Sequence, residues 1–123
     1  KHISTGAAIS FVIAHNTEPN TGYGRVIIDN AGHTRIVEAK EYTGDPTEHC
    51  CINAGIYLIQ KDFLEQSIEL MQTNAISREY HITDLVSIAG EKKLPVTTIV
   101  ASFDDVRGIN NQHELWAAEQ ILR

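Results

Sequence analysis

The apolar run at residues 7–14, AAISFVIA, limits the possible folds of this chain more than any other segment. It shows no helical period and no capping residues, and it is too short to span a bilayer. A continuous apolar run of this length is typical of a β-strand that is covered on both faces. The run therefore predicts a buried strand inside a layered fold.

Further strand and helix patterns follow this run. Strand patterns lie at residues 25–30, 34–38, 52–60 and 95–101. Helical patterns lie at residues 62–73, 83–90 and 112–122. The turn-forming residues 30–32 join the first two of these strands into a predicted β-hairpin. The order of strand, hairpin, strand, two helices, strand and helix predicts an α/β fold that has a mixed sheet, the hairpin and flanking helices.

Local signals mark the expected ends of the helices and the connecting loops. The residues available as N-terminal caps are Asp62, Thr83, Asp84, Asn111 and Gln112. Gly90 is expected to stop the second helix. Residues 15–24 and 41–49 have the composition of loops, because Asn, Pro and Gly cluster there.

The charge balance excludes several classes of partner. Lys and Arg number 10 against 16 Asp and Glu, which gives a net charge of -6 over 123 residues. No basic cluster interrupts this acidity, so neither nucleic acid nor an anionic membrane is an expected partner. The length and the apolar content suit one domain.

The cysteines and histidines give little sign of a metal or disulfide framework. Cys50 and Cys51 are adjacent, and neighbouring cysteines rarely have the geometry to bridge each other. This use of cysteine favours a reducing compartment and predicts a cytoplasmic protein. The six histidines show no zinc-like spacing, so a metal site of His49 with the two cysteines is only a remote alternative.

Four features admit both a structural and a functional interpretation. The glycines of T-G-Y-G-R, residues 21–25, either shape a tight turn or let backbone approach a ligand. Glu38 is either a surface residue or an acceptor for sugar hydroxyls. Asn53 lies in an apolar strand, where its amide needs a backbone partner or a polar ligand. Asn110, beside Asn111, either belongs to a helix start or offers an oxygen to Mg²⁺.

The order of five motifs is more specific than any one of them. They are T-G-Y-G-R, I-V-E-x-K-E, I-N-A-G-I-Y, E-Y-H-I-T-D and G-I-N-N. In this order the chain resembles the sugar-phosphate nucleotidyltransferases, and most of all the uridyltransferase domain of the bacterial N-acetylglucosamine-1-phosphate uridyltransferases. The resemblance covers residues 7–123, and it implies the C-terminal half of a Rossmann-like nucleotidyltransferase domain.

The resemblance also implies roles for individual residues. The backbone at Gly24 and the side chains of Glu38 and Asn53 match contacts to N-acetylglucosamine, and a bulky side chain at Gly24 is expected to block the sugar and leave the fold intact. Thr83 matches a contact to the sugar phosphate. Glu79 and Tyr80 match the adjoining wall of the pocket, and Asn110 matches a ligand of Mg²⁺. The sequence departs from the family at Arg78, where a glycine is usual, and at His81, where a tyrosine is usual.

Two segments of the family are absent from these 123 residues. They are the Gly-rich loop that holds the nucleotide and the segment whose Asp binds Mg²⁺. The resemblance therefore implies a single partial domain, the half that binds the sugar phosphate or UDP-sugar of bacterial cell-wall precursor synthesis. We expect no turnover of UTP and N-acetylglucosamine 1-phosphate by the chain alone, and weak or no binding of Mg²⁺.

The missing half predicts exposed strand edges and apolar sheet surface. We therefore expect a homo-oligomer or a complementing chain. The alternative hypothesis is a catalytically silent remnant that acts as a self-associating interaction module.

Overall fold

The computed structural model describes residues 1–16, 22–45, 47–48 and 50–123. The predicted loops at residues 15–24 and 41–49 therefore lie partly outside the described residues, as does His49. In chain order the elements are α1 (His2–Thr5), β1 (Ile9–His15), β2 (Arg25–Ile28), β3 (Thr34–Val37), β4 (Cys51–Ile59), α2 (Lys61–Ser67), the 3₁₀-helix η1 (Ile68–Leu70), α3 (Asp84–Glu91), β5 (Val96–Ala101) and α4 (Gln112–Leu122).

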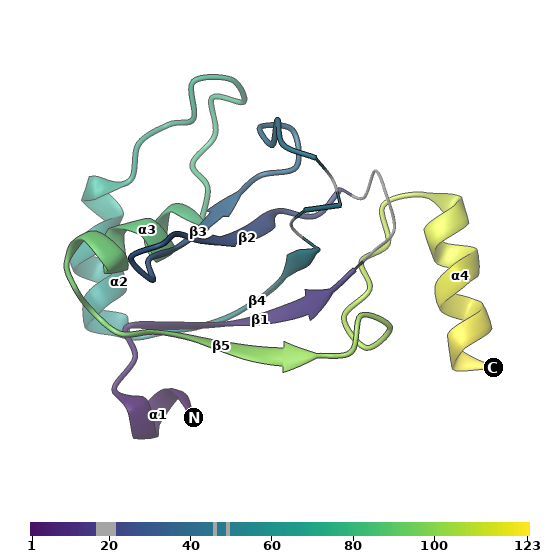
Figure 1. Cartoon of the computed structure of the whole chain (residues 1–123), viewed down its shortest axis with the longest axis horizontal. Coiled ribbons are helices and arrows are strands. Elements are labelled where there is room, and N and C mark those ends of the chain that lie inside the picture. Colours follow the sequence, from purple (N-terminus) through teal and green to yellow (C-terminus); the bar gives the residue numbers. More distant parts are fainter. Residues whose placement is uncertain (17–21, 46, 49) are drawn as a thin grey trace.

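The predicted α/β class with a mixed sheet is confirmed. One five-stranded sheet has the order β3-β2-β4-β1-β5 (Figure 1). β1 and β5 are parallel, and the other neighbours are antiparallel. The hairpin of β2 and β3 is also confirmed, but it joins the rest of the sheet at a single residue pair, Arg25 with Ile52.

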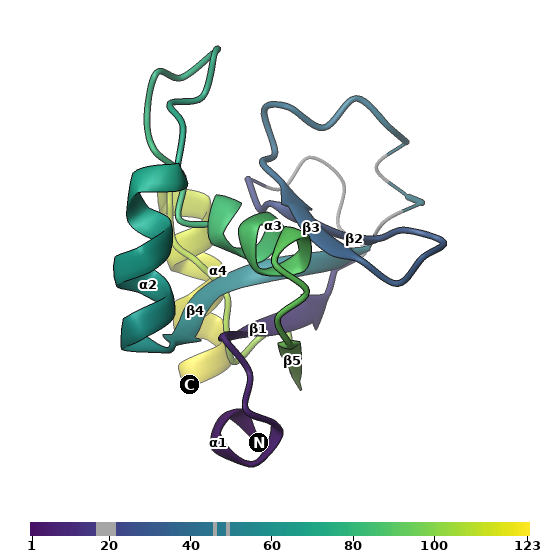
Figure 2. The ribbon, with the colours of Figure 1, turned by 90° about the vertical axis from the view of Figure 1, so that its left-hand side faces the viewer.

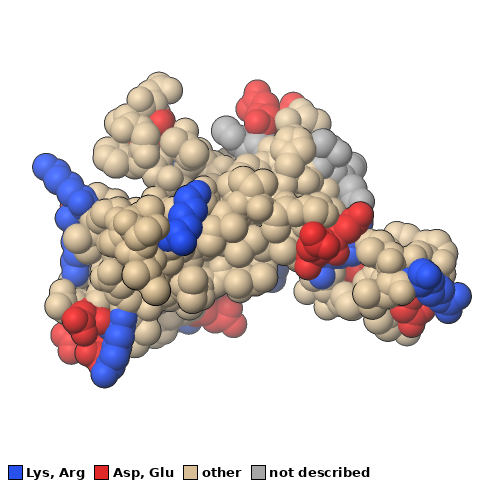
Figure 3. Space-filling view, turned by 90° about the horizontal axis from the view of Figure 1, so that it is seen from below, with Lys and Arg blue, Asp and Glu red and all other residues tan. Residues whose placement is uncertain are grey.

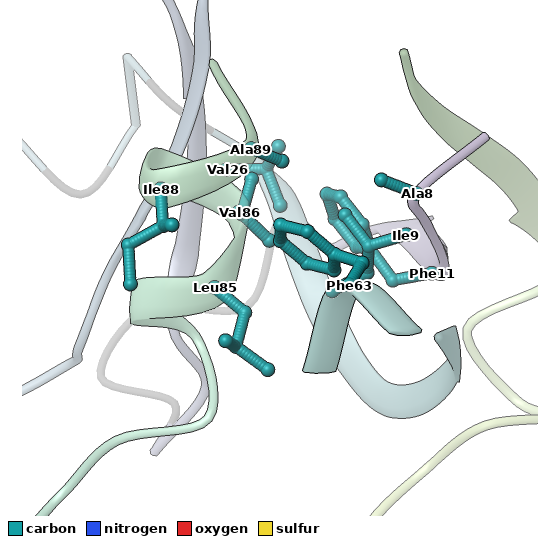
Figure 4. Close-up of a cluster of buried hydrophobic side chains, with 9 residues drawn as sticks. All are labelled: Ala8, Ile9, Phe11, Val26, Phe63, Leu85, Val86, Ile88 and Ala89. Atoms are coloured by element: carbon teal, nitrogen blue, oxygen red, sulfur yellow. The ribbon is translucent and has the colours of Figure 1, made fainter. Parts of the chain in front are cut away.

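The core lies between the sheet and the helices α2 and α3. The apolar run at residues 7–14 supplies much of this core, because residues 7–11 and Ala14 are all buried. The buried apolar side chains form one cluster, drawn in Figure 4, of Ala8, Ile9, Phe11, Val26, Phe63, Leu85, Val86, Ile88 and Ala89. Burial of one such side chain of Val, Leu, Ile or Phe size contributes roughly 1.5–3 kcal/mol. This cluster therefore holds α3 against both β1 and the hairpin.

The helices cover the sheet unevenly. α2 and α3 lie at the same end of the sheet (Figures 1 and 2), whereas α4 stands apart at the opposite end. None of the residues of α4 is buried. Within the described part of the chain, no helix is long and apolar enough to cross a membrane.

Several predicted helix ends were wrong. The helix predicted at residues 62–73 is α2, which ends at Ser67 and continues only as η1, so it stops short of residue 73. Its N-cap is Gln60, and Asp62 lies in the first turn. Gly90 does not stop α3, which runs to Glu91.

The two later N-termini differ from each other. Thr83 occupies the N-cap of α3, but its side chain makes no capping hydrogen bond. Asn111 caps α4 as predicted: its side chain accepts from the Glu114 amide at 2.9 Å. The Glu114 side chain in turn accepts from the Asn111 amide, which completes a capping box. The short helix α1 was not predicted.

A bulge in β4 shapes the strand around Asn53. Phe11 of β1 pairs with Tyr57, but Ile13 pairs with Asn53, so β4 carries extra residues between these two pairs. Gly55 lies inside the bulge with φ +78, a left-handed conformation that favours glycine. Bulges redirect the side chains beside them. Here the bulge brings the side-chain amide of Asn53 to the Tyr57 hydroxyl.

The bulge predicts opposite effects for two glycine substitutions. Gly55→Ala is expected to lower the free energy of unfolding by about 1 kcal/mol, because a Cβ disfavours the left-handed backbone although the space around it is open. Gly90→Ala serves as the matched control. It lies in α3, also in open space, and is expected to raise stability by about 0.5 kcal/mol. Urea unfolding of both variants measures these changes, and equal effects of the same sign would contradict the assignment of the bulge.

Candidate functional site

Four residues from distant parts of the sequence meet where the hairpin joins β4. The backbone amide of Asn53 donates to the Gly24 carbonyl at 2.9 Å. The Thr83 hydroxyl donates to Oε1 of Glu38 at 2.8 Å. A Cβ built on Gly24 would lie 3.7 Å from Oε2 of Glu38. The structure therefore brings together Gly24, Glu38, Asn53 and Thr83, all of which the resemblance marked as site residues.

Glu38 lies just after β3, and the rest of the fold fixes its orientation. Thr83 is buried, and its hydroxyl occupies one carboxylate oxygen of Glu38. This contact uses the hydroxyl that could have capped α3. The second oxygen, Oε2, lies on the side of Gly24. A carboxylate held by a hydrogen bond at one oxygen can accept ligand hydroxyls at the other.

Asn53 is positioned by the bulge. Its Nδ2 donates to the Tyr57 hydroxyl, and its Oδ1 accepts from the Gly55 amide at 3.2 Å. Burial raises the pKa of the Tyr57 phenol, and the negative charge of Glu38 raises it further. Tyr57 therefore keeps its proton at neutral pH.

Gly24 is required by close packing. A Cβ at this position would lie 3.0 Å from Cγ2 of Ile36 and 3.4 Å from the Val37 carbonyl oxygen. The expectation that a bulky side chain at Gly24 leaves the fold intact is therefore wrong, because such a side chain displaces β3. Only Ala, with a small shift of Ile36, is a usable substitution here.

A cavity of about 200 Å³ adjoins Glu38. Its lining comes from Gly22, Glu38, Ala39, Lys40, Glu41, Ile76, Ser77, Glu79 and His81. Sites that enclose drug-sized ligands usually measure roughly 300–1,000 Å³, so this cavity suits a small ligand or one part of a larger one. Glu79 lies in its wall as the resemblance implies. Tyr80 does not line it, and 66% of its surface is exposed.

The segment from Asn74 to His81 forms one side of this cavity. The Asn74 side chain accepts from the amides of Ile76 and Ser77 at 2.8 and 3.0 Å, and its Nδ2 donates to Glu41. His81 lies within hydrogen-bond distance of the Ser77 hydroxyl, at 3.1 Å. The segment is thus fixed at both ends, and the histidine that replaces the family's tyrosine takes part in holding it.

Arg78 adopts a left-handed backbone with φ +59. Its position is the one at which the family usually has a glycine. The conformation explains that preference, because an L-residue with a Cβ is disfavoured there by roughly 1–2 kcal/mol. Arg78 adopts this conformation although it carries a Cβ.

Acidic side chains dominate the electrostatics of the site. Burial raises the pKa of the Asp84 carboxyl; His81 acts in the opposite direction, and the charges of Glu41 and Glu38 add to the rise. Lys40 is the cation in the lining of the cavity. Lys40 is therefore the lining side chain that would oppose the negative charge of the neighbouring carboxylates.

Asn110 lies away from these residues, in the segment before α4. Its amide donates to Oε2 of Glu114, and the residue is exposed. Among the residues that the structure describes, no group of three or more His, Cys, Asp or Glu side chains could hold a metal ion. Asn110 offers one neutral oxygen, whereas Mg²⁺ is usually bound through carboxylates. The described residues therefore do not form a magnesium site by themselves.

Sequence reasoning missed Tyr23 and Tyr57. Both act through partners that a local pattern does not reveal: Tyr57 meets Asn53 only through the bulge, and Tyr23 accepts from the Gly108 amide. The glycine in N-A-G was a usable signal for the bulge, because a glycine inside a strand pattern often marks one.

A larger hollow of about 380 Å³ lies elsewhere, between the β2–β3 turn and the C-terminal part of α3. Its lining includes Asp29, Arg35, Glu91 and Lys93, and none of the predicted site residues. The smaller cavity is the better candidate, because it borders the convergence of Gly24, Glu38, Asn53 and Thr83.

The left-handed Arg78 predicts a stabilising substitution. Arg78→Gly is expected to raise the free energy of unfolding by about 0.5–1 kcal/mol, the relief of the backbone cost less the added entropy of the unfolded chain. Arg78→Ala is the matched control, because it removes the exposed side chain and keeps the Cβ. Chemical denaturation should show a gain for Gly and none for Ala, and an equal gain for both would assign the effect to the side chain.

Comparison with known proteins was made by sequence and by structure. No family model matches the chain. The chain is 35% identical over 108 residues to the bifunctional protein GlmU of Sulfurimonas denitrificans, which covers 88% of this chain and 25% of that protein. It is 31% identical over 121 residues to the GlmU of Campylobacter jejuni and to that of a Nitratiruptor species, covering 98% of this chain and 28% of each relative.

A solved structure shows the same fold. The uridine diphosphate N-acetylglucosamine pyrophosphorylase of Trypanosoma brucei superposes with a TM-score of 0.58 at 15% identity, over 84% of this chain and 26% of that one. The chain thus spans about a quarter of the length of the relatives that it matches. The family resemblance that the five ordered motifs predicted is confirmed, and the chain belongs to the same family as the bifunctional GlmU proteins.

Proposed function

We propose that this chain forms the sugar-phosphate-binding part of a nucleotidyltransferase site that makes UDP-N-acetylglucosamine. The convergence of Gly24, Glu38, Asn53 and Thr83 beside a small cavity is the observation that supports it most directly. The homology to GlmU proteins supports a nucleotidyltransferase-like fragment and is consistent with this reaction. The proposed domain is single and partial, and its proposed location is the cytoplasm of a bacterium.

The proposed reaction joins two phosphorylated substrates. A phosphate oxygen of N-acetylglucosamine 1-phosphate forms a bond to the α-phosphorus of UTP, and the bond from that phosphorus to the bridging oxygen breaks to release pyrophosphate. No covalent enzyme intermediate is needed. Catalysis of this kind rests on holding two anions in line and neutralising their charge.

The residues of the site divide between the sugar and its phosphate. Oε2 of Glu38 accepts hydrogen bonds from sugar hydroxyls, and the backbone at Gly24 and the amide of Asn53 contact the N-acetylglucosamine ring. Thr83 serves the phosphate, and Lys40 in the lining of the cavity opposes its charge. Glu79 forms part of the adjoining wall. A ligand phosphate would compete with Glu38 for the Thr83 hydroxyl, since the two side chains are bonded to each other.

Turnover needs groups that these 123 residues do not contain. The family's Gly-rich nucleotide loop and its metal-binding Asp are absent from the sequence. We propose that a complementing chain or segment supplies them, and that Asn110 is one of several ligands of a Mg²⁺ ion in the completed site. The chain alone is proposed to bind the sugar phosphate without converting it.

Binding of N-acetylglucosamine 1-phosphate tests this proposal. Titration of the whole chain should shift the backbone amide resonances of Gly24 and Glu38 in a saturable manner. Asn53→Ala should weaken this response several-fold, because it removes the amide that the bulge holds in the site. Amide shifts followed by heteronuclear NMR provide the measurement, with circular dichroism as a check of the fold.

Asn30→Ala is the matched control for that titration. Asn30 is an exposed asparagine in the β2–β3 turn, away from Asn53, and its substitution should leave the response unchanged. Absence of any saturable shift at high ligand concentration would refute the proposed sugar-phosphate site. Equal loss in both variants would show that Asn53 has no specific part in it.

A second proposal, self-association, is favoured by the exposed apolar surface. β5 lies at one edge of the sheet, and Val100 on this strand is 76% exposed. Ile56 and Leu58 of β4 are each more than half exposed, as is Trp116 of α4. Figure 3 shows a face with broad areas of uncharged side chains between separate acidic and basic groups. Surfaces of this kind usually become covered by another chain.

Self-association is expected to appear in the mass of the chain in solution. Multi-angle light scattering should give a mass above the 13.7 kDa of one chain. Val100→Lys should shift that mass toward the monomer, because a charge on an exposed edge opposes pairing of strands. Ile3→Lys is the control, because Ile3 is exposed on α1 outside the sheet. A monomeric wild type would refute this proposal.

A further inference from the structure

Tyr23 joins the candidate site to the segment that contains Asn110. The Tyr23 hydroxyl accepts a hydrogen bond from the backbone amide of Gly108, a residue 85 positions away in the sequence. The glycines on either side of Tyr23 belong to the site: Gly22 lines the cavity, and the Gly24 carbonyl accepts from the Asn53 amide. Tyr23 therefore touches both regions at once.

The ring of Tyr23 is anchored by packing as well as by its hydroxyl. It meets Phe103 edge to face, with 5.6 Å between ring centroids. The Arg107 guanidinium lies over the Phe103 ring, 4.7 Å from its centroid. Between these residues the backbone turns tightly, because the amide of Val106 donates to the Phe103 carbonyl at 3.2 Å. The segment after β5 is thus folded around the tyrosine.

Gly108 permits the approach of the hydroxyl. A Cβ at this position would lie 3.1 Å from the Tyr23 hydroxyl oxygen and 3.6 Å from the ring. That separation is too close for a side chain without a shift of the tyrosine or of the segment. The glycine in G-I-N-N therefore has a packing role that is independent of any metal.

The other end of the segment is held by the capping box of α4. Oε2 of Glu114 accepts from the amide of Asn110 and, at 3.2 Å, from that of Asn111. Asn110 stands only two residues after Gly108. The backbone of Asn110 is consequently placed by two fixed points, the Tyr23 hydroxyl and the N-terminus of α4.

We infer that Tyr23 is a positioning residue that couples occupancy of the sugar-phosphate cavity to the placement of Asn110. This inference rests on the proposed function of the cavity. A ligand that contacts Gly22 or Gly24 moves the backbone on either side of Tyr23. The hydroxyl transmits this movement to Gly108, and the segment carries it to Asn110. The sugar side and the Asn110 side of the site then respond together.

The test compares ligand-induced amide shifts in the whole chain and in Tyr23→Phe. N-acetylglucosamine 1-phosphate should shift the amides of Asn53 and of Gly108 and Asn110 in the wild type. Tyr23→Phe keeps the ring against Phe103 and removes the hydroxyl. In this variant the shifts at Gly108 and Asn110 should fall several-fold, while a saturable shift at Asn53 remains.

A matched control and a second variant keep the test decisive. Tyr42→Phe removes a hydroxyl that donates to the Asp45 carbonyl at 3.0 Å, and it should behave as the wild type. Gly108→Ala alters the other partner of the same hydrogen bond, because its Cβ displaces the Tyr23 hydroxyl. It should also reduce the ligand-induced shifts at position 108 and at Asn110. Hydrogen exchange at the Gly108 amide should quicken in Tyr23→Phe.

The outcomes separate this inference from the proposed function. Shifts at Asn53 without shifts at Gly108 and Asn110 in the wild type would overturn the coupling and leave the sugar-phosphate site standing. Full shifts at Gly108 and Asn110 in Tyr23→Phe would also overturn the coupling and leave the sugar-phosphate site standing. Absence of a shift at Asn53 in the wild type would refute the proposed function, and the coupling with it.

Discussion

The attachment of the hairpin to β4 is the constraint on which the rest of the site depends. β2 pairs with β4 only through Arg25 and Ile52, with the Gly24–Asn53 hydrogen bond beside that pair. One backbone hydrogen bond contributes a net of about 0.5–1.5 kcal/mol, and burial of Val26 contributes roughly 1.5–3 kcal/mol. Packing of the hairpin on α3 therefore supplies most of the stability of the junction, and the hydrogen bond fixes its register.

Thr83 shows how a tertiary contact competes with a local one. Its position before Asp84 is that of an N-cap, and its hydroxyl is of the type that caps helices. In the folded chain the hydroxyl donates to Glu38 instead. A hydrogen bond to a charged acceptor contributes about 1.5–3 kcal/mol, more than the roughly 1 kcal/mol of a typical cap. The N-terminus of α3 thus lacks a side-chain cap, and the Thr83 hydroxyl orients the Glu38 carboxylate instead.

Local patterns predicted the elements well and the long-range contacts not at all. Apolar runs and turn residues are local, so the five strands and three of the helices were found within a few residues. The predicted helix to residue 73 was too long: Met71 packs on the core as its spacing indicated, although the backbone there is no longer helical. Glu38 and Asn53 were found only through the order of motifs, because nothing in their neighbourhood shows that the hairpin folds back onto the bulged strand.

The two glycines around Tyr23 illustrate where such reasoning can be refined. Neither Gly22 nor Gly24 has a positive φ, so conformational freedom does not explain them. A Cβ at Gly24 would require a small shift of Ile36 and would contact the Val37 carbonyl. A Cβ at Gly22 would meet nothing within 4 Å, yet Gly22 lines the cavity beside Glu38. Close packing therefore accounts for a glycine at position 24, whereas position 22 lies open beside the cavity.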